Sequence, residues 1–125
     1  MDKKILIVDD EDAIRFLLAH FISSKFPFEI LQATSGNSAI ELLKKEKYIE
    51  VVLCDYRMMD GNGGTVYDYI KRSELLIPFI MMSTDQPEKY DCFKHFYEEH
   101  PKNGYLQKPF KQENIISLLE NILEN

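Results

Sequence analysis

The stretch ILIVDD, residues 5–10, places an uninterrupted apolar run directly before two carboxylates. Two further runs also end at a charged residue: VVLC (51–54) before Asp55, and GYLQ (104–107) before Lys108. Short apolar runs separated by helix-length segments are typical of buried parallel strands. Because parallel strands end at a common edge of their sheet, we expect three carboxylates and one ammonium to meet there.

Electrostatic repulsion among these carboxylates predicts that a cation lies beside them. The carboxylates of Asp9, Asp10 and Asp55 would repel one another at close range, and such a cluster is tolerated only when positive charge offsets it. Lys108 supplies one such charge. Carboxylates are also the side chains that usually hold Mg²⁺ in proteins. The edge is therefore a candidate site for a divalent metal and a phosphoryl group.

Length and composition indicate an ordinary globular domain. The 125 residues suffice for one sizeable core, so residues 1–125 are predicted to form a single domain with no second one. The formal net charge is −6 and no Lys/Arg run exceeds two residues, which argues against direct binding of nucleic acid. No apolar stretch is long enough for a transmembrane helix or a secretory signal, so a cytoplasmic location without membrane attachment is expected. Cys54 and Cys92 are expected to be free thiols there.

Strand and helix patterns alternate along the whole chain. Strands are predicted over residues 4–8, 28–33, 50–54, 78–82 and 104–107, and helices over 12–25, 36–46, 64–72, 86–98 and 111–123. This alternation predicts a doubly wound α/β fold, with a five-stranded parallel sheet covered by helices on both faces. Sheets of this class bind ligands outside the carboxyl ends of the strands, where the charged residues are expected.

Four motifs, in this order, resemble the receiver domain of two-component response regulators: ILIVDDE (5–11), CDYRM (54–58), MMST (81–84) and YLQKPF (105–110). The resemblance covers essentially the whole chain and extends to the stand-alone, chemotaxis-type receivers. It implies the flavodoxin-like (βα)5 fold with strand order 2-1-3-4-5, and a role in a signalling phosphorelay. The chain would then be either a stand-alone adaptor or the N-terminal piece of a longer regulator.

The resemblance implies roles for the acidic residues. Asp55 would accept a phosphoryl group from a histidine kinase or a phosphotransfer protein and become an aspartyl phosphate. Asp9, Asp10, Asp55 and the backbone carbonyl of Arg57 would hold Mg²⁺, with one of the acidic pair acting directly and the other partly through water. A carboxylate is an established nucleophile for such a step, which otherwise needs mainly positioning and charge neutralisation. The protein would catalyse at most its own phosphorylation and dephosphorylation.

Two further side chains would contact the phosphoryl group. Lys108 would pair with one phosphoryl oxygen, aimed by a cis peptide bond to Pro109, as in the family. Ser83 would form a hydrogen bond with another phosphoryl oxygen, but Thr84 follows it directly and the choice between the two is open. Counting five residues from Pro78, as the family does, favours Ser83.

The output of such a protein would be a change in its surface. Tyr105 matches the switch aromatic of the family, whose ring would follow Ser83 inward after phosphorylation. A static place on an edge strand is the alternative for Tyr105. The face formed by the fourth helix, fifth strand and fifth helix would control an unidentified partner protein, or join two copies as a homodimer.

Two segments depart from the family pattern. Met59 stands where the family usually has proline, so the loop after the third strand lacks one rigid residue. Residues 86–103 are rich in aromatic side chains, where the family has small ones. The spacing of Phe93, Phe96 and Tyr97 predicts the core-facing stripe of an α-helix. An exposed aromatic patch that binds a partner is the alternative.

Simpler structural roles compete with these assignments. The acidic pair could serve only to cap the first helix, Asp55 could merely end a strand, and Lys108 could be a solvated surface residue. Three histidines lack the spacing of metal ligands and are assigned to no site: His20, His95 and His100.

Two rival functions remain open. One is a degenerate receiver that binds its partners without phosphorylation. The other is an aspartate-nucleophile phosphohydrolase of the haloacid-dehalogenase type. That class places its two acids two residues apart, whereas Asp9 and Asp10 are adjacent.

Overall fold

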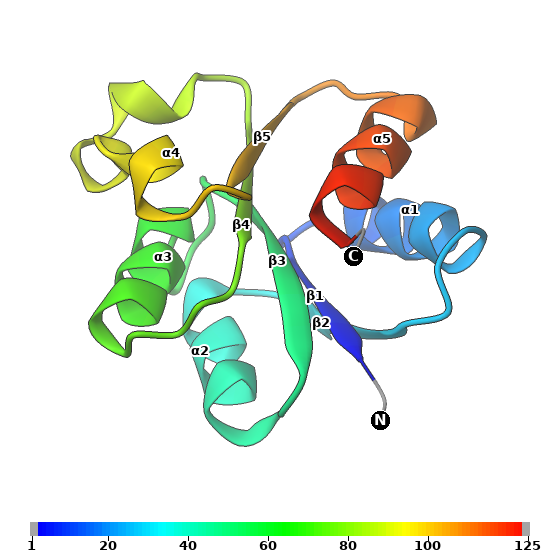
Figure 1. The fold of residues 1–125 in the computed structure, drawn as a ribbon, viewed down its shortest axis with the longest axis horizontal. Helices are drawn as coiled ribbons and strands as arrows, with labels where there is room; N and C mark the ends of the chain where they lie inside the picture. Colours follow the sequence, from blue (N-terminus) through cyan, green and yellow to red (C-terminus); the bar gives the residue numbers. More distant parts are fainter. Residues whose placement is uncertain (1–2, 124–125) are drawn as a thin grey trace.

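A computed structural model describes residues 3–123 of the chain. Over this range the chain forms a five-stranded parallel sheet in the order β2-β1-β3-β4-β5 (Figure 1). The strands are β1 (Lys4–Val8), β2 (Glu29–Ala33), β3 (Ile49–Asp55), β4 (Phe79–Ser83) and β5 (Gly104–Gln107). The predicted doubly wound, flavodoxin-like topology is confirmed.

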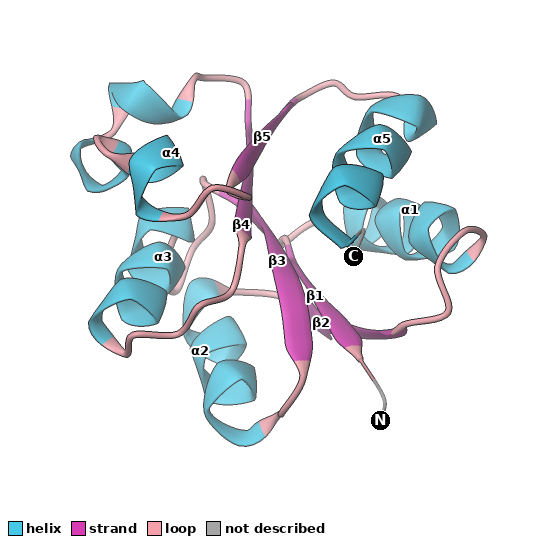
Figure 2. Ribbon diagram, in the orientation of Figure 1, coloured by secondary structure: helices cyan, strands magenta, loops and turns pink. Residues whose placement is uncertain are grey.

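Helices cover both faces of the sheet (Figure 2). One face carries α1 (Asp12–Ser23) and α5 (Gln112–Leu123), and the other carries α2 (Gly36–Lys45), α3 (Gly63–Arg72) and the short α4 (Phe96–Glu99). Outside the α4 region, the helices and strands begin and end within two residues of their predicted bounds.

The apolar runs are continuous because both faces of each strand are covered. Alternate side chains of β1 enter different cores: Ile5 and Ile7 pack with α1 and α5, whereas Leu6 and Val8 pack with α2 and α3. All four are fully buried. Burial of apolar surface stabilises the folded state by roughly 25 cal/mol per Å². The buried strands therefore hold the side chains at their carboxyl ends in fixed positions.

The fourth helix is shorter than predicted. Residues 86–98 do not form one α-helix, because two 3₁₀ turns precede α4: Pro87–Lys89 and Asp91–Phe93. The side chains of this segment that turn inward recur at every third residue: Pro87, half-buried Tyr90, Phe93 and Phe96. Three residues per turn is the 3₁₀ repeat. This spacing brings the rings to one side without a continuous α-helix.

The predicted aromatic stripe is confirmed for two of its members and wrong for the third. Phe93 and Phe96 are buried against Phe79, with ring centroids 5.9 and 6.2 Å away. Tyr97 is 46% exposed, because the α-helical spacing used to place it does not apply to a segment that begins as 3₁₀ turns. Buried Asn103 closes the segment, accepting from the N–H of Phe79 and donating to the carbonyl of Phe96, each at 2.8 Å.

No helix within residues 3–123 is both long enough and apolar enough to cross a membrane. Cys54 is buried at the end of β3 and Cys92 is half-buried, and both are free thiols, as predicted. Burial raises the pKa of the Cys54 thiol, so this side chain is an unreactive part of the core.

Candidate functional site

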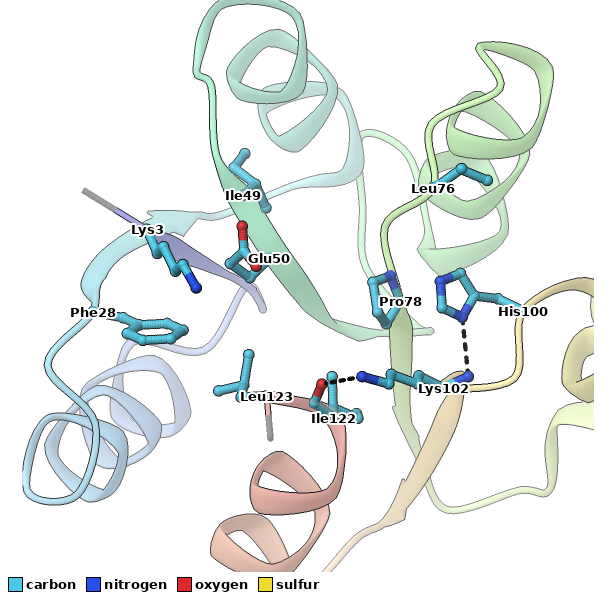
Figure 3. A pocket seen from close by; sticks show the side chains of 10 residues that line it. All are labelled: Lys3, Phe28, Ile49, Glu50, Leu76, Pro78, His100, Lys102, Ile122 and Leu123. Carbon is cyan, nitrogen blue, oxygen red and sulfur yellow. Dashed lines mark hydrogen bonds between the residues drawn. The ribbon is translucent and has the colours of Figure 1, made fainter. Parts of the chain in front are cut away.

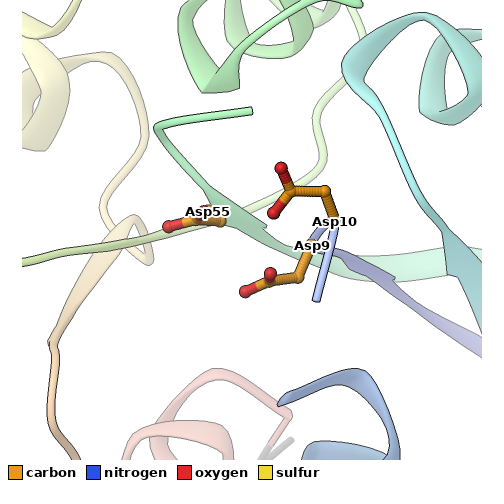
Figure 4. Close-up of side chains that lie close together, drawn as sticks. All are labelled: Asp9, Asp10 and Asp55. Carbon is orange, nitrogen blue, oxygen red and sulfur yellow. The ribbon is translucent and has the colours of Figure 1, made fainter. Parts of the chain in front are cut away.

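The carboxylates meet at the carboxyl edge of the sheet, as predicted. Parallel pairing sets Val8 of β1 beside Cys54 of β3, so the next residues, Asp9 and Asp55, lie at the ends of neighbouring strands. Oxygens of Asp9, Asp10 and Asp55 all lie within 4.8 Å of one another (Figure 4). Asp9 and Asp55 are buried and Asp10 is exposed, so the cluster opens to solvent beside Asp10.

Lys108 brings a positive charge to this cluster from the end of β5. Its Nζ lies 3.1 Å from Oδ2 of Asp9 and 3.1 Å from Oδ1 of Asp55. Its backbone N–H donates to the carbonyl of Ser83 at 2.9 Å, and its peptide bond to Pro109 is cis. The alternative of a solvated surface lysine is therefore wrong.

Negative charge exceeds positive charge at this edge. Burial raises the pKa of the Asp55 carboxyl to about 6; Lys108 opposes the rise, and Asp9 and Asp10 add to it. Burial acts against the charged form of Lys108, but the carboxylates of Asp55 and Asp9 outweigh it and raise the pKa of the ammonium. A further cation would therefore stabilise the ionised form of Asp55.

The hydrogen bonds leave particular oxygens free. Both oxygens of Asp9 are engaged, since Oδ1 accepts from the N–H of Glu11 at 2.9 Å and Oδ2 accepts from Lys108 at 3.1 Å. Oδ1 of Asp55 pairs with Lys108. Oδ2 of Asp55 and both oxygens of Asp10 accept no hydrogen bond from residues 3–123. The bond to Glu11 means that Asp9 supports the turn into α1, but the N-cap of this helix is Glu11, so neither member of the acidic pair is the cap residue.

The donor set fits Mg²⁺. This ion prefers oxygen ligands, keeps several waters and is typically held by one or two carboxylates. Asp10 and Asp55 each offer a carboxylate oxygen, with Asp10 at the open side, and Arg57 lies in the loop that follows β3. Asp10 and Arg57 line the same cavity of about 420 Å³, whose other walls are Tyr56, Met58, Met59 and Asn62.

Of the two candidate hydroxyls, that of Ser83 is the one held at a strand end. Ser83 is the buried last residue of β4, whereas Thr84 is exposed. Pairing of the strands sets Met82, the residue before Ser83, beside Asp55. The Oγ of Ser83 accepts from the N–H of Asp85 at 3.0 Å, so its own hydrogen is still available to donate.

Tyr105 contacts Ser83 from β5. The ring is half-buried, and its hydroxyl donates to the backbone carbonyl of Ser83 at 3.0 Å. The predicted pair of switch residues is thus in direct contact, through the main chain of Ser83 rather than through its hydroxyl.

Tyr90 links the 3₁₀ segment to residues beside the site, and the sequence did not predict these contacts. Asp85 accepts from the guanidinium of Arg57 at 3.3 Å and from the hydroxyl of Tyr90 at 3.1 Å. The ring of Tyr90 stacks on that of Tyr56, with a centroid distance of 3.8 Å. These contacts depend on the break in the fourth helix, for which only the three-residue spacing of the inward side chains is a signal.

A buried arginine beside the acidic pair was also missed. Arg15 on α1 is 7% exposed, and its guanidinium donates to the backbone carbonyl of Asp9 at 2.9 Å and to Oε1 of Gln32 at 3.2 Å. These bonds fix the end of β1 and the turn that follows it. An arginine among the apolar residues of a helix is the signal that could have identified it.

A separate cavity of about 320 Å³ lies at the opposite, amino-terminal edge of the sheet (Figure 3). Lys102 crosses it to donate to the carbonyl of Ile122 at 3.1 Å, and the N–H of Lys102 donates to Nδ1 of His100 at 3.0 Å. Among the described residues, the acidic cluster is the group that could hold a metal ion, and it includes no histidine.

The chain is similar to response regulators both in a comparison with family models and in a comparison with curated proteins. A family model described as the response regulator receiver domain matches residues 5–120. The alkaline phosphatase synthesis transcriptional regulatory protein PhoP of Bacillus subtilis is 28% identical over 123 residues, covering 98% of this chain and 49% of that protein. Response regulator SaeR of Staphylococcus aureus is 29% identical over 119 residues, covering 95% and 50%. The chain thus spans about half the length of these curated relatives.

Solved structures resemble the chain over nearly its whole length. Chemotaxis protein CheY4 of Vibrio cholerae gives a TM-score of 0.81 at 26% identity, covering 98% of this chain and 99% of that chain. The receiver domain of NtrX from Brucella abortus gives a TM-score of 0.79 at 26% identity, covering 97% and 98%.

Proposed function

The chain belongs to the response regulator receiver family, and we propose that Asp55 accepts a phosphoryl group, with Mg²⁺, from a histidine kinase or a phosphotransfer protein. The observation that carries the proposal is the arrangement at one sheet edge. Three carboxylates have oxygens within 4.8 Å of one another, and the Lys108 ammonium lies 3.1 Å from two of them. Ser83, which is buried and carries a hydroxyl, is the last residue of the adjacent strand β4. Phosphoryl transfer to a carboxylate uses groups of these kinds.

The nucleophile is a carboxylate oxygen of Asp55. Oδ1 pairs with Lys108, so we assign the attack on phosphorus to Oδ2. A bond forms between this oxygen and phosphorus while the phosphorus–nitrogen bond of the phosphohistidine donor breaks, and its electron pair leaves with the imidazole. The product is an aspartyl phosphate, which water can hydrolyse.

Side chains already in place would hold the transferred group. Lys108 exchanges a carboxylate partner for a phosphoryl oxygen, and Ser83 donates its hydroxyl hydrogen to another phosphoryl oxygen. The bond from the N–H of Asp85 fixes the Oγ of Ser83 beforehand, and donors positioned before the reaction are the most effective. Mg²⁺, when bound, would neutralise charge that develops on the phosphoryl oxygens.

The hydrogen bonds support a division of labour among the metal ligands. Asp10, Asp55 and the backbone carbonyl of Arg57 would hold Mg²⁺ directly, and Asp9 would act partly through water. Both oxygens of Asp9 are engaged by protein donors, whereas Asp10 is exposed and faces the open side. This difference favours Asp10 as the direct ligand of the acidic pair.

The signal would leave through the face formed by α4, β5 and α5. The hydroxyl of Tyr105 bonds to the carbonyl of Ser83 at 3.0 Å, so movement of Ser83 toward a phosphoryl group would alter the position of the ring on β5. A partner protein, or a second copy of the chain, would bind the altered face. The net charge of −6 favours a protein partner over direct contact with nucleic acid.

Intact mass after incubation with acetyl phosphate and Mg²⁺ tests the proposal. We expect the wild-type chain to gain one phosphoryl group, and Asp55→Asn, or wild type in EDTA, to gain none. No gain in the wild-type chain would favour the degenerate receiver. Sustained Mg²⁺-dependent hydrolysis of a generic phosphoester would instead favour the phosphohydrolase.

A further inference from the structure

We propose that Asp60 is a positioning residue that anchors the metal-binding loop to the start of α2. The inference rests on the proposed function, because the loop contains Arg57. Both carboxylate oxygens of Asp60 are used in the anchor. Oδ2 accepts from the hydroxyl of Ser35 at 2.9 Å, and Oδ1 accepts from the side-chain amide of Asn37 at 2.9 Å.

Main-chain hydrogen bonds join the same two segments. The N–H of Asn37 donates to the carbonyl of Asp60 at 3.0 Å, and the N–H of Gly36 donates to the carbonyl of Gly61 at 2.9 Å. The approach is so close that a Cβ at Gly36 would lie 2.5 Å from the oxygen of Gly61. The loop and the first turn of α2 therefore form one tightly fitted junction.

Aspartate fits position 60 for two reasons: it tolerates the backbone conformation found there, and its carboxylate can accept both hydrogen bonds. Its φ is 57° and that of Gly61 is 92°, and Asp tolerates the left-handed region better than most residues. Hydrogen bonds from Asn37 and Ser35 lower the pKa of the Asp60 carboxyl. The side chain is therefore ionised at neutral pH and accepts both bonds.

The anchor fixes the middle of a loop whose two ends are already held. Tyr56 and Gly63 close the loop on itself, since the N–H of Gly63 donates to the carbonyl of Tyr56 at 2.9 Å. Met59, next to Asp60, is 83% exposed, so burial of its side chain contributes little to fixing the loop. Arg57, whose carbonyl is assigned to the metal, lies between the closed end and the anchor. Loss of the anchor would free this carbonyl to move, and metal binding would weaken more than folding.

Two substitutions at Asp60 separate geometry from charge. Asp60→Gly removes both carboxylate bonds but adopts a positive φ without strain, and Asp60→Asn keeps an acceptor oxygen and tolerates the same φ. Both lose the same charge, so the difference between them reports the anchor. We expect Asp60→Gly to raise the dissociation constant of Mg²⁺ about fivefold, equivalent to about 1 kcal/mol, and Asp60→Asn to retain most of the wild-type affinity.

Urea unfolding of the full chain, without and with Mg²⁺, measures the effect. A ligand that binds the folded state raises the free energy of unfolding by RT ln(1 + [L]/Kd), so the increment caused by Mg²⁺ reports affinity separately from stability. Asn37→Ala, which removes one of the two carboxylate contacts, should give a smaller loss of increment in the same direction. Asp68→Asn is the matched control, because it removes an exposed acid on α3 that pairs with Arg72 at 2.7 Å, and its increment should equal that of wild type.

The two ideas fail in different ways. An unchanged increment in Asp60→Gly, with a clear increment in wild type, would overturn the anchor and leave the proposed function standing. A purely structural role would give this result, because it lowers stability equally with and without the metal. Absence of any increment in wild type would overturn both.

Discussion

The Nζ of Lys108 lies 3.1 Å from Oδ1 of Asp55, and this contact joins the end of β5 to the end of β3. The same ammonium lies 3.1 Å from Oδ2 of buried Asp9. Without a metal ion, Lys108 is thus the cation that makes the buried carboxylates tolerable. In the proposed reaction one of its carboxylate partners is replaced by a phosphoryl oxygen.

Replacing Lys108 by methionine leaves two buried carboxylates without their cation. We expect the free energy of unfolding to fall by about 2 to 4 kcal/mol in EDTA at neutral pH. The pKa of Asp55 should rise above about 6, because Lys108 no longer opposes the effect of burial. Urea unfolding measures the first change and NMR titration of the carboxyl measures the second. Lys111→Met, at an exposed position, is the control, and equal effects of the two substitutions would contradict the electrostatic role.

The stability of the metal-free protein should fall as the pH rises through about 6. Burial raises the pKa of Asp55 from 3.8 to about 6, so the folded state binds this proton more tightly than the unfolded chain does. The resulting stabilisation is fully present below the unfolded pKa and is lost as the pH rises through the folded pKa. After allowance for solvent screening, the loss is about 1 to 2 kcal/mol.

Urea unfolding in EDTA across this pH range, for wild type and Asp55→Asn, checks that prediction. The variant has no carboxyl at position 55, so this part of the pH dependence should disappear and the variant should be the more stable protein above about pH 7. Superimposable pH profiles would mean that Asp55 is not the group responsible.

Substitution of the two neighbouring hydroxyls distinguishes their roles. Ser83 is buried at the strand end and Thr84 is exposed, so Ser83→Ala should slow phosphorylation by acetyl phosphate about tenfold or more, as expected for a lost hydrogen bond to a charged group. Thr84→Ala should react at nearly the wild-type rate. Time-resolved intact mass gives both rates, and a larger effect of Thr84→Ala would transfer the assignment to that residue.

The 3₁₀ segment predicts unequal effects for two aromatic residues. Phe93 is fully buried, and Phe93→Ala should lower the free energy of unfolding by about 3 to 5 kcal/mol. Tyr97 is 46% exposed, and Tyr97→Ala should change it by about 0.5 kcal/mol or less. Urea unfolding compares them. Similar large losses for both would support the continuous α-helix instead.

Arg57→Ala should shorten the lifetime of the aspartyl phosphate. Arg57 and Asp85 form an ion pair of 3.3 Å beside the site, where they can screen the phosphoryl group from attacking water. We expect decay to become about two- to fivefold faster, equivalent to a barrier change of about 0.4 to 1 kcal/mol. Stability should hardly change, because Arg57 is largely exposed and such pairs contribute little. Loss of the added mass after the phosphodonor is removed gives the rate, and an unchanged rate would dispose of the screening role.

Much of the fold and of the acidic edge could be predicted from short-range pattern. Runs such as ILIV (5–8) are apolar at every position because helices cover both faces of the sheet, so their nature as parallel strands was apparent. Strand order then brings Asp9 and Asp55 together, because Asp9 follows Val8, Asp55 follows Cys54, and Val8 pairs with Cys54 between β1 and β3. The position of Lys108 followed from the same rule applied to β5.

The contacts that could not be predicted join segments through particular side chains. Asp60 bonds to Ser35 and Asn37 across the junction between the β3–α3 loop and the start of α2, and no periodicity or motif brings those residues together. Tyr90 stacks on Tyr56 only because the fourth helix is broken. Such contacts depend on tertiary packing, which overrides local helix preference.

Mapping the added group to a peptide tests the central claim most directly. After treatment with acetyl phosphate and Mg²⁺, digestion and mass spectrometry should place one phosphoryl group on the peptide that contains Asp55. Hydroxylamine should remove it, as expected of an acyl phosphate. A group on any other peptide, or one that resists hydroxylamine, would contradict the assignment of Asp55 as the phosphoryl acceptor.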